Sequence, residues 1–496
     1  MLRQCLPASV RHVLAELPET LDETYERILS EIPKSNRVYA HRLLQCLTVA
    51  VRPLGVEELG EVLVVDFTAI GGIPKLKEDL RWEDQEQAVL SACSSLITVV
   101  ENWGSRVVHF SHFSVKEFLT SDRLATTKMN TSRYHHIRLD EAHTTMAQAC
   151  LSVILRLDEE SIGKFPLARY AAQHFGEHVE FEDVLSHMRG GIDDLLDEDK
   201  PHFAAWLWMR DGRRLDMSPQ PARAVPLYYV TTFGYLCMVD HLISKHPEHL
   251  NTMGEDGTLL HAASRGGHAK IVELLLGRCA DVDVRNASDQ TPLHLAAENG
   301  SVEVTRKLIE RNADTNTVDI NGRTPLYFAV VGGDRHGDGN LDVVRFLLDR
   351  GADADARDNE DSTPLHAASF AGSVKTVELL LEHGANIHGR NEKGWTPLLY
   401  AAVGITDAAA DFYFDAILFL LEHGADADAQ DNDHSTPLHI AAVFGCVKAA
   451  RLLLEHGASV HLQNSEGKTA IQVGSERGHE EFVQLLSEHL QGERKI

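Results

Sequence analysis

The second half of the chain repeats one pattern of apolar and polar positions. Each copy has a threonine, usually followed by proline and leucine, then small apolar residues, a glycine and a second apolar stripe. Because apolar positions three and four residues apart form one face of a helix, the pattern predicts two short helices per copy. The copies begin at Thr258, Thr291, Thr324, Thr363, Thr396, Thr436 and Thr469, and a weaker copy begins at Val225.

The copy at residues 363–384 shows how the local sequence favours this structure. The Thr363 hydroxyl can accept a hydrogen bond from the free N–H groups at a helix start, and Pro364 suits the first helical position. Gly372 is expected to end the first helix and Gly384 the second. One such pair of helices cannot bury its own apolar face, so the copies are predicted to stack.

The threonine and histidine of each copy could be read as a reactive pair. The histidine recurs at the same place in four copies of the pattern. A nucleophile and its base would not be copied along a stack, so we interpret the pair as a structural cap. The positions of this structural motif are Thr258, His261, Thr291, Pro292, His294, Thr324, Pro325, Thr363, Pro364, His366, Thr396, Pro397, Thr436, Pro437 and His439.

The repeated phrase resembles the ankyrin repeat, which has a period of 33 residues and the signature T-P-L-H-x-A. The resemblance covers residues 222–496, as seven or eight repeats. It implies an α-solenoid with β-hairpin tips, which binds proteins through its tips and the concave face of its inner helices. Extra residues at 332–340 and 404–414 are expected to form solvated loops between the two helices of a unit.

The first half of the chain predicts a mixed architecture. Helices are expected over residues 17–29, 36–51 and 83–96, and a turn plus a helix over 52–67. Two β-rich runs are expected over 97–111, and a helix over 112–121 with Ser114 as its cap. Three helices followed by a β-hairpin are typical of a winged-helix domain. The chain is therefore predicted to be mostly α-helical, with a helical segment at 1–35, a winged-helix-like α+β module at 36–121, a helical linker at 122–221 and the repeats at 222–496.

Three phrases in this half resemble the segment behind the NACHT nucleotide-binding domain of fungal NLR-like proteins. They are "LPETLDETYERIL", "CSSLITVVE" and "HFSVKEFL", and they are similar to the winged-helix domain named after GPI inositol-deacylase. The resemblance implies a scaffold between an NTPase domain and a sensor, without deacylase activity.

No NTPase domain is expected within this chain, because the pattern G-x-x-x-x-G-K-[ST] does not occur in it. The fragment "GKT" at 467–469 has Leu462 at the upstream glycine position. Three interpretations stay open. The chain is a standalone adaptor, or part of a nucleotide-gated receptor whose NTPase domain acts in cis or in trans, or a structural tether that links membranes or cytoskeleton.

Charge and composition narrow the partners. The net charge of −27 disfavours nucleic acid and anionic membranes, and the predicted helix at 83–96 has three acidic residues and no lysine or arginine. We interpret the acidic charge first as solvated charge that keeps a long stack soluble, and a basic protein partner is the alternative that stays open. No apolar stretch approaches the 18 residues of a membrane span, and the seven scattered cysteines form no Cys-x-x-Cys pair. We expect no membrane insertion and a cytoplasmic location.

Two groups of residues match catalytic patterns in part. "HFGEH" at 174–178 fits the zinc-peptidase pattern H-x-x-E-H but has no evident third ligand. His109 and His112 lie beside serines, but no serine stands in G-x-S-x-G. Neither group predicts a site, so no cofactor and no enzymatic activity are expected.

The tips of the repeats are the predicted partner-binding region. Several acidic residues occur there, together with a tryptophan, a residue type enriched in binding hot spots. The sequence thus predicts a non-enzymatic scaffold or sensor that binds a protein. The candidate partner-binding residues are Asp358, Glu360, Asp361, Trp395, Asp431, Asp433 and His434.

Overall fold

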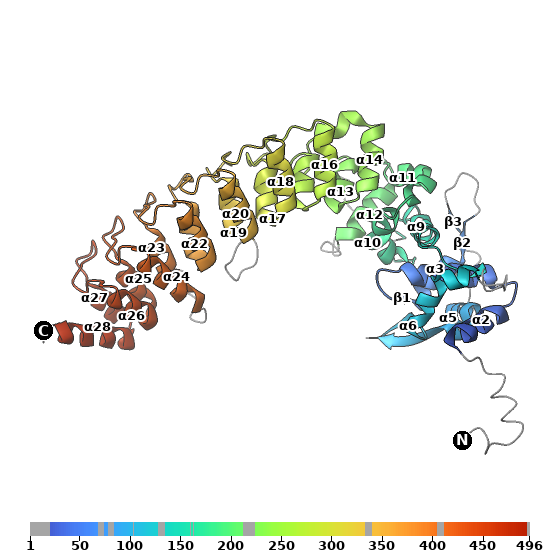
Figure 1. Ribbon diagram of the computed structural model, residues 1–496, viewed down its shortest axis with the longest axis horizontal. Helices are drawn as coiled ribbons and strands as arrows, with labels where there is room; N and C mark the ends of the chain where they lie inside the picture. The colour runs from blue at the N-terminus through green and yellow to red at the C-terminus, as the bar shows by residue number, and fades with distance from the viewer. Residues whose placement is uncertain are drawn as a thin grey trace, which may run out of the picture. The chain divides into compact units, whose positions relative to one another are not determined.

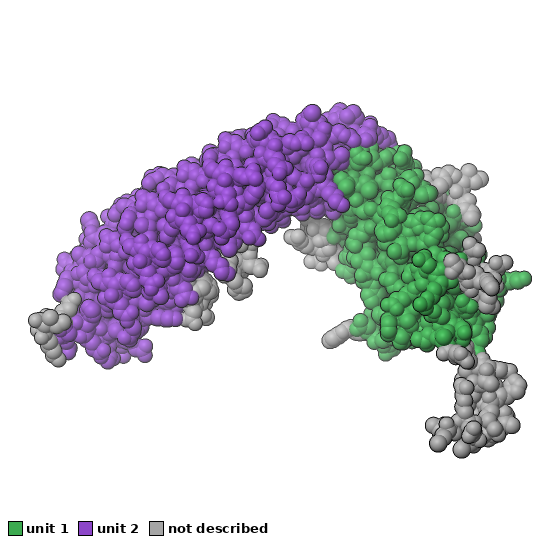
Figure 2. Space-filling model, viewed as in Figure 1, with its two compact units in different colours: residues 1–226, 235–241 green, residues 227–234, 242–496 purple. Residues whose placement is uncertain are grey.

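Two compact units make up the chain, residues 1–226 with 235–241 (unit 1) and residues 227–234 with 242–496 (unit 2), as Figure 2 shows. The structure, a computed structural model, describes residues 20–67, 74–77, 84–102, 104–126, 134–158, 160–161, 163–211, 224–332, 340–403 and 411–493. The predicted loops at 332–340 and 404–414 lie largely outside these residues.

Unit 1 begins with a small α+β module. Its helices and strands follow in the order α2 (Leu21–Glu31), α3 (Arg37–Val49), β1 (Leu54–Gly55), α4 (Val56–Leu63), β2 (Val65–Asp66), β3 (Lys75–Leu76), α5 (Gln85–Cys93), β4 (Ile97–Asn102), β5 (Ser105–Phe110) and α6 (Phe113–Leu119). The antiparallel sheet has the order β1-β5-β4, and β2 pairs with β3. The prediction of three helices followed by a β-hairpin is confirmed, and β1 adds a third, two-residue strand to it.

The core of this module follows from the apolar stripes of its helices. Leu43 and Leu44 of α3, Leu59 of α4 and Val89 of α5 are completely buried. Between β4 and β5 the chain turns at Gly104, which has a φ of 81°.

The start of α6 differs from the prediction. Ser114 lies inside the helix, and His112 is the capping residue, because its Nδ1 accepts a hydrogen bond from the Ser114 N–H at 3.3 Å. An imidazole nitrogen two residues upstream thus replaces the serine oxygen that the sequence suggested.

A run of helices completes unit 1. These are α7 (Asp122–Thr126), α9 (Leu139–Ile154), α10 (Ala168–Val179), α11 (Arg189–Leu195) and α12 (Pro201–Asp211). Residues 235–241, from α14 (Leu236–Lys245) and the residue before it, also belong here. Tyr235 explains this, because its ring lies where a Cβ on Gly176 of α10 would stand.

Unit 2 is an array of helix pairs (Figure 1). We number the repeats 1 to 7 from the threonines Thr258 to Thr469, and call the first helix of each repeat its inner helix. The inner helices are α15 (Leu259–Arg265), α17 (Pro292–Asn299), α19 (Pro325–Val331), α21 (Pro364–Ala371), α23 (Pro397–Val403), α25 (Pro437–Phe444) and α27 (Ala470–Glu476). The second helices are α16 (Ala269–Gly277), α18 (Val302–Glu310), α20 (Leu341–Asp349), α22 (Val374–Glu382), α24 (Asp411–Glu422), α26 (Val447–Glu455) and α28 (Glu480–Glu493), and α13 (Pro226–Phe233) precedes them all.

Packing between repeats uses the small residues of the pattern. Ala297, Ala368 and Ala402 are fully buried on the inner helices, which lets neighbouring helices approach closely. Gly372 ends α21 with a φ of 73°, the left-handed conformation that favours glycine. The predicted helical array is confirmed.

The tips between repeats are tight turns. In the tip before Thr363, the Asp358 N–H donates to the Ser362 carbonyl and the Asp361 N–H to the Asp358 carbonyl, both at 2.9 Å. Among the described tips, strand-like pairing is limited to the single bridges Met253–Thr258 and Gln463–Thr469. The predicted β-hairpin tips are therefore hydrogen-bonded turns for most of the array.

Candidate functional site

The threonine–histidine pairs lie inside the array. The Nδ1 of His366 accepts hydrogen bonds from the Thr363 N–H at 3.1 Å and from its hydroxyl at 2.8 Å. The Nε2–H then donates to the Trp395 carbonyl at 3.1 Å. Burial lowers the pKa of His366, so the neutral imidazole that this bonding requires is also the favoured form. We call this arrangement the histidine clamp.

The aspartates that begin the tips turn their side chains inward. Asp358 Oδ1 accepts from the N–H groups of Glu360 at 2.9 Å and Ser362 at 2.8 Å. Asp431 does the same with Asp433 at 2.9 Å and Ser435 at 2.7 Å. The Asp358 side chain is 7% exposed, and so is Asp431.

These two aspartates have a structural role within the acidic run that the sequence predicts along the tips. The same position holds an asparagine in other tips, where Asn391 Oδ1 accepts from Lys393 and Trp395 at 3.0 and 2.9 Å. The side-chain oxygen at this position organises the turn whether or not it is charged. The Oδ1 atoms of Asp358 and Asp431 are therefore engaged within their own tips, and contact of these residues with a partner stays a prediction.

The other predicted tip residues are on the surface. Glu360, Asp361, Asp433 and His434 are exposed. Asp361 lies 3.6 Å from Arg357 in an ion pair. Its φ of 60° and the φ of 57° at His434 are left-handed, at a position where other tips have glycine, such as Gly394 with 76°.

Trp395 is half-buried, not free at the end of a tip. Its ring meets the ring of Tyr400 edge to face, with centroids 5.4 Å apart. Tyr400 in turn contacts Phe370 of the preceding inner helix, with centroids 6.2 Å apart. The tryptophan thus adjoins an aromatic group that the sequence analysis did not single out.

Apolar side chains occupy one exposed face of four successive inner helices. They stand four, seven or eight residues after the threonine in repeats 3 to 6, and Val331 and Phe370 are 51% and 50% exposed. Phe444 is 40% exposed, and the remaining members are partly exposed. This apolar strip consists of Phe328, Val331, Phe370, Tyr400, Val403, Ile440, Val443 and Phe444.

The strip ends where the same position becomes charged. The residue seven after the threonine is Arg265 in repeat 1, Glu298 in repeat 2 and Glu476 in repeat 7, and all three are exposed. A comparison of equivalent positions along the sequence would have revealed this change. The apolar residues are therefore a local feature of repeats 3 to 6, not a requirement of the repeat.

The histidines of "HFGEH" do not converge on a site. His174 Nδ1 is paired with Glu177 at 2.9 Å. His178 is buried and bonded through Nε2 to the Tyr170 hydroxyl and through Nδ1 to His143 Nδ1, both at 2.9 Å. Burial lowers the pKa of His178 to about 3. Both ring nitrogens of His178 are thus engaged in packing α9 against α10.

His109 and His112 also lack a catalytic arrangement. His109 is exposed on β5, whereas His112 Nδ1 lies 2.6 Å from the Ser114 hydroxyl as part of the α6 cap. The same hydroxyl lies 2.8 Å from the Tyr25 hydroxyl.

One group of metal-ligating residues occurs among the described residues, formed by His246, Glu248 and His249 with their ligand atoms within 4.8 Å of one another. His246 Nδ1 already lies 3.2 Å from Glu248, and these two side chains are 41% and 62% exposed. The two histidine rings stack at an interplanar angle of 16°. Stacked, solvated rings on a surface turn match an ordinary ion pair better than ligands directed at one ion.

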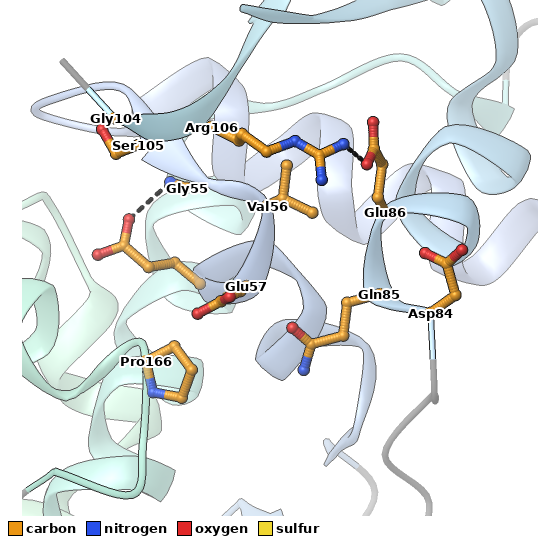
Figure 3. A pocket seen from close by; sticks show the side chains of 11 residues that line it. Gly55, Val56, Glu57, Asp84, Gln85, Glu86, Gly104, Ser105, Arg106 and Pro166 are labelled. Atoms are coloured by element: carbon orange, nitrogen blue, oxygen red, sulfur yellow. Dashed lines mark hydrogen bonds and ion pairs between the residues drawn. The ribbon is translucent and has the colours of Figure 1, made fainter. Parts of the chain in front are cut away.

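A hollow of about 790 Å³ opens beside α4, the start of α5 and the turn between β4 and β5. Glu86 pairs with Arg106 across it (Figure 3). Glu58 is held by Arg52 at 2.5 Å and by the Gly55 N–H at 2.7 Å, and Asp84 accepts from the Gln87 N–H at 2.9 Å. The acidic groups Glu58, Asp84 and Glu86 thus have structural partners, and no catalytic pattern was found in the lining.

Comparison with known proteins decides the family of the array. The family described as "Ankyrin repeats (3 copies)" matches residues 227–319, 262–358, 335–410 and 405–495, which together span more than half of the chain. The chain belongs to the ankyrin repeat family. In unit 1, "GPI inositol-deacylase, winged helix domain" matches residues 25–129.

Two individual proteins are similar to this ankyrin repeat chain. Azaphilone pigments biosynthesis cluster protein L of Monascus ruber is 32% identical over 296 residues, which cover 54% of this chain and 61% of that relative. The chain thus matches less than two thirds of that protein. The crystal structure of the human ASB11 ankyrin repeat domain is 29% identical, covers 46% of this chain and 96% of that domain, and has a TM-score of 0.40. No helix among the described residues is both long and apolar enough to span a membrane.

Proposed function

We propose that this ankyrin repeat protein is a non-enzymatic interaction scaffold or sensor, whose apolar strip binds a protein partner. The exposed strip on repeats 3 to 6 is the observation that carries the proposal. Exposure of the valine and phenylalanine side chains on neighbouring helices to water is unfavourable. Burial of this apolar surface against a partner would lower the free energy. Aromatic residues are also enriched at the energetic centres of interfaces.

The exposed tip residues supply the rim of this surface. Glu360, Asp361 and Asp433 remain available once the inward-turned aspartates are set aside, and Arg357, Arg390 and Lys393 lie among them. Such mixed charge favours a partner with apolar anchors and a few Lys or Arg side chains around them. The rim contributes mainly to specificity and association rate, while the strip contributes most of the affinity.

Left-handed backbone at Asp361 and His434 supports a role for these side chains. A non-glycine residue costs about 1 kcal/mol in this conformation, less for Asp. Glycine occupies the position in the tips of Gly322, Gly394 and Gly467, and Asp289 is a third non-glycine residue there, with a φ of 58°. Side chains retained at such a cost are favoured candidates for contact with a partner.

A second candidate function is part of a nucleotide-gated receptor. The observation that favours it is the winged-helix match at residues 25–129 ahead of the repeats. The module would then act as a scaffold or relay for an NTPase domain in cis or in trans. Immunoblotting of source cells with an antibody to the tip at 425–440 tests the cis form. A band near 55 kDa would argue against it, and a band larger by a whole domain would favour it.

Selection from a displayed library of random 16-residue peptides tests the binding proposal without knowledge of the partner. The full chain should enrich peptides with aromatic or aliphatic anchors, and the double variant Phe370→Asp/Phe444→Asp should weaken their binding at least tenfold. The matched control is Val38→Asp/Val100→Asp, which changes apolar residues of unit 1 that are 44% and 45% exposed. Equal loss in both double variants, or in neither, would contradict the proposal.

A further inference from the structure

Histidine clamps connect four pairs of neighbouring repeats. In each, Nε2 donates to the carbonyl of the residue just before the next threonine, at 2.9 to 3.1 Å. The donors His261, His294, His366 and His439 join repeats 1 to 2, 2 to 3, 4 to 5 and 6 to 7. Each clamp therefore ties one inner helix to the start of the next.

Repeats 3 and 5 have no histidine to make this bond. Tyr327 and Leu399 stand at the equivalent positions. The carbonyls that a clamp would reach belong to Ser362 and Ser435, which accept the turn bonds from Asp358 and Asp431 at 2.9 and 3.0 Å. The joint between repeats 3 and 4 and the joint between repeats 5 and 6 are thus unclamped.

The inner helices also pack less extensively at these two joints, whereas the second helices do not differ in this way. The inner helices α19 and α21, and α23 and α25, pack less extensively than the pairs that a clamp joins. The large Phe370 and Tyr400 side chains of repeats 4 and 5, by contrast, meet within a clamped pair. Loss of the clamp therefore coincides with reduced contact between the inner helices.

Tip asparagines hold the same two joints together from another place. The backbone N–H of Asn359 donates to the Asn321 carbonyl at 2.9 Å, and its side-chain amide donates to the Ile320 carbonyl at 3.0 Å. The backbone N–H of Asn432 likewise donates to the Lys393 carbonyl at 3.0 Å, and its side-chain amide donates to the Glu392 carbonyl at 2.7 Å. These joints are bonded twice at the tips and lack the bond at the helix starts, which is the arrangement of a hinge whose pivot lies at the tips.

We propose that the array is made of three blocks, repeats 1–3, 4–5 and 6–7, which bend relative to one another at the two unclamped joints. In repeat arrays, stability is a sum of repeat and nearest-neighbour terms, so a weak interface becomes a boundary between cooperative units. Each joint separates successive members of the apolar strip along the chain. The first joint falls between Val331 and Phe370, and the second falls between Val403 and Ile440. Bending there adjusts the spacing of the anchors to the partner, a consequence that rests on the proposed function.

Native-state hydrogen exchange on the full chain, without any partner, tests this inference. We expect three exchange blocks with boundaries at the two unclamped joints. Tyr327→His and Leu399→His should add the missing clamps and raise protection of the adjoining inner-helix amides about fivefold, because Thr324 and Thr396 are already in place. One exchange rate across all repeats of the unmodified chain would overturn the proposal.

Further substitutions test the proposal even if the two histidine variants misfold. His294→Tyr gives repeat 2 the residue that repeat 3 has at the equivalent position, Tyr327. It removes a clamp and should create a new boundary between repeats 2 and 3. Asn359→Ala and Asn432→Ala should instead speed exchange at the existing boundaries. If His294→Tyr leaves the first block intact, or the asparagine variants do not affect the two joints, the three-block arrangement is wrong. An array that exchanges in blocks but binds no peptide would contradict only the proposed function.

Discussion

An acidic residue has two different roles at the tips of the repeats. At the first position of a tip its oxygen accepts two backbone N–H groups, as in Asp358 and Asp431. Two residues later, Glu360 and Asp433 are exposed to solvent. One carboxylate therefore stabilises the fold and the next is available for recognition.

The first role predicts how three substitutions rank. Asp431→Ala leaves the N–H groups of Asp433 and Ser435 without their acceptor and should lower the free energy of unfolding by about 1–3 kcal/mol. Asp431→Asn should cost less than about 0.5 kcal/mol, because Asn391 makes the same bonds in its own tip. Urea unfolding of the full chain, followed through the repeat domain's transition, measures these values.

Asp433→Ala is the control for this ranking, and it should change stability by less than about 0.5 kcal/mol. A stability loss for Asp431→Asn as large as for Asp431→Ala would show that charge, not the turn geometry, is what matters at this position.

The histidine clamps make stability depend on pH. Burial lowers the pKa of His294 to about 4, below the value of about 6.5 in the unfolded chain. As pH falls through 6.5 the unfolded chain therefore binds the proton first, and the clamp's stability is lost progressively between about pH 6.5 and 4. The slope is about 1.4 kcal/mol per pH unit for each such histidine.

His294→Gln isolates this contribution. Gln472 occupies the same position in repeat 7, where its Oε1 accepts from the Thr469 N–H at 2.9 Å. The variant should stay folded at pH 7 and show a shallower loss of stability between pH 6 and 4.5. An unchanged slope, in unfolding curves recorded at several pH values, would mean that His294 does not titrate on unfolding.

The structural roles of the repeated threonines, prolines and glycines were predictable from the sequence, because each of these residues satisfies a local requirement of the backbone. The inward orientation of Asp358 and Asp431 was not predictable, because an aspartate in a turn and an aspartate in solvent occur in the same polar context. The two cases differ in whether the N–H groups of the following residues point at the carboxylate. That orientation depends on how the turn closes.

At the scale of elements, a chain of hydrogen bonds joins three parts of unit 1. The Tyr170 hydroxyl accepts from the Val51 N–H at 3.1 Å and donates to His178 Nε2 at 2.9 Å. His178 then donates from Nδ1 to His143 of α9 at 2.9 Å. The α3–β1 connection, α9 and α10 are thereby fixed together with all members uncharged.

Tyr170→Phe should break this chain at its centre. The Val51 N–H and His178 Nε2 would lose their partner, which should lower the free energy of unfolding of unit 1 by about 1–3 kcal/mol. Tyr134→Phe is the control, since the Tyr134 side chain is 47% exposed. Equal thermal stability of the two variants would contradict a structural role for the chain.

The elements themselves were predictable where their signal is local. Helix periodicity and the β-rich runs identified α2 to α6 and the β4–β5 hairpin. The two-residue strand β1 was not predictable, because its pairing of Leu54 with Val108 joins residues far apart in the sequence. The His112 cap was missed because serine is the commoner capping residue.

At the scale of the whole molecule, the proposed binding surface emerges from comparison among the repeats. No single repeat shows the apolar strip, since one exposed phenylalanine on a helix is unremarkable. Alignment of the seven copies shows the same face apolar in repeats 3 to 6 and charged in repeats 1, 2 and 7 at the position seven residues after the threonine. The partner itself cannot be read from one chain, because its identity depends on a second surface.

The proposed partner-binding surface is the apolar strip, formed by Phe328, Val331, Phe370, Tyr400, Val403, Ile440, Val443 and Phe444. Hydrogen exchange of the full chain with and without a saturating selected peptide tests it most directly. We predict that added protection is concentrated in α19, α21, α23 and α25 and their adjoining tips, and is absent in Phe370→Asp/Phe444→Asp. Protection confined to the second helices, or to unit 1, would contradict the claim.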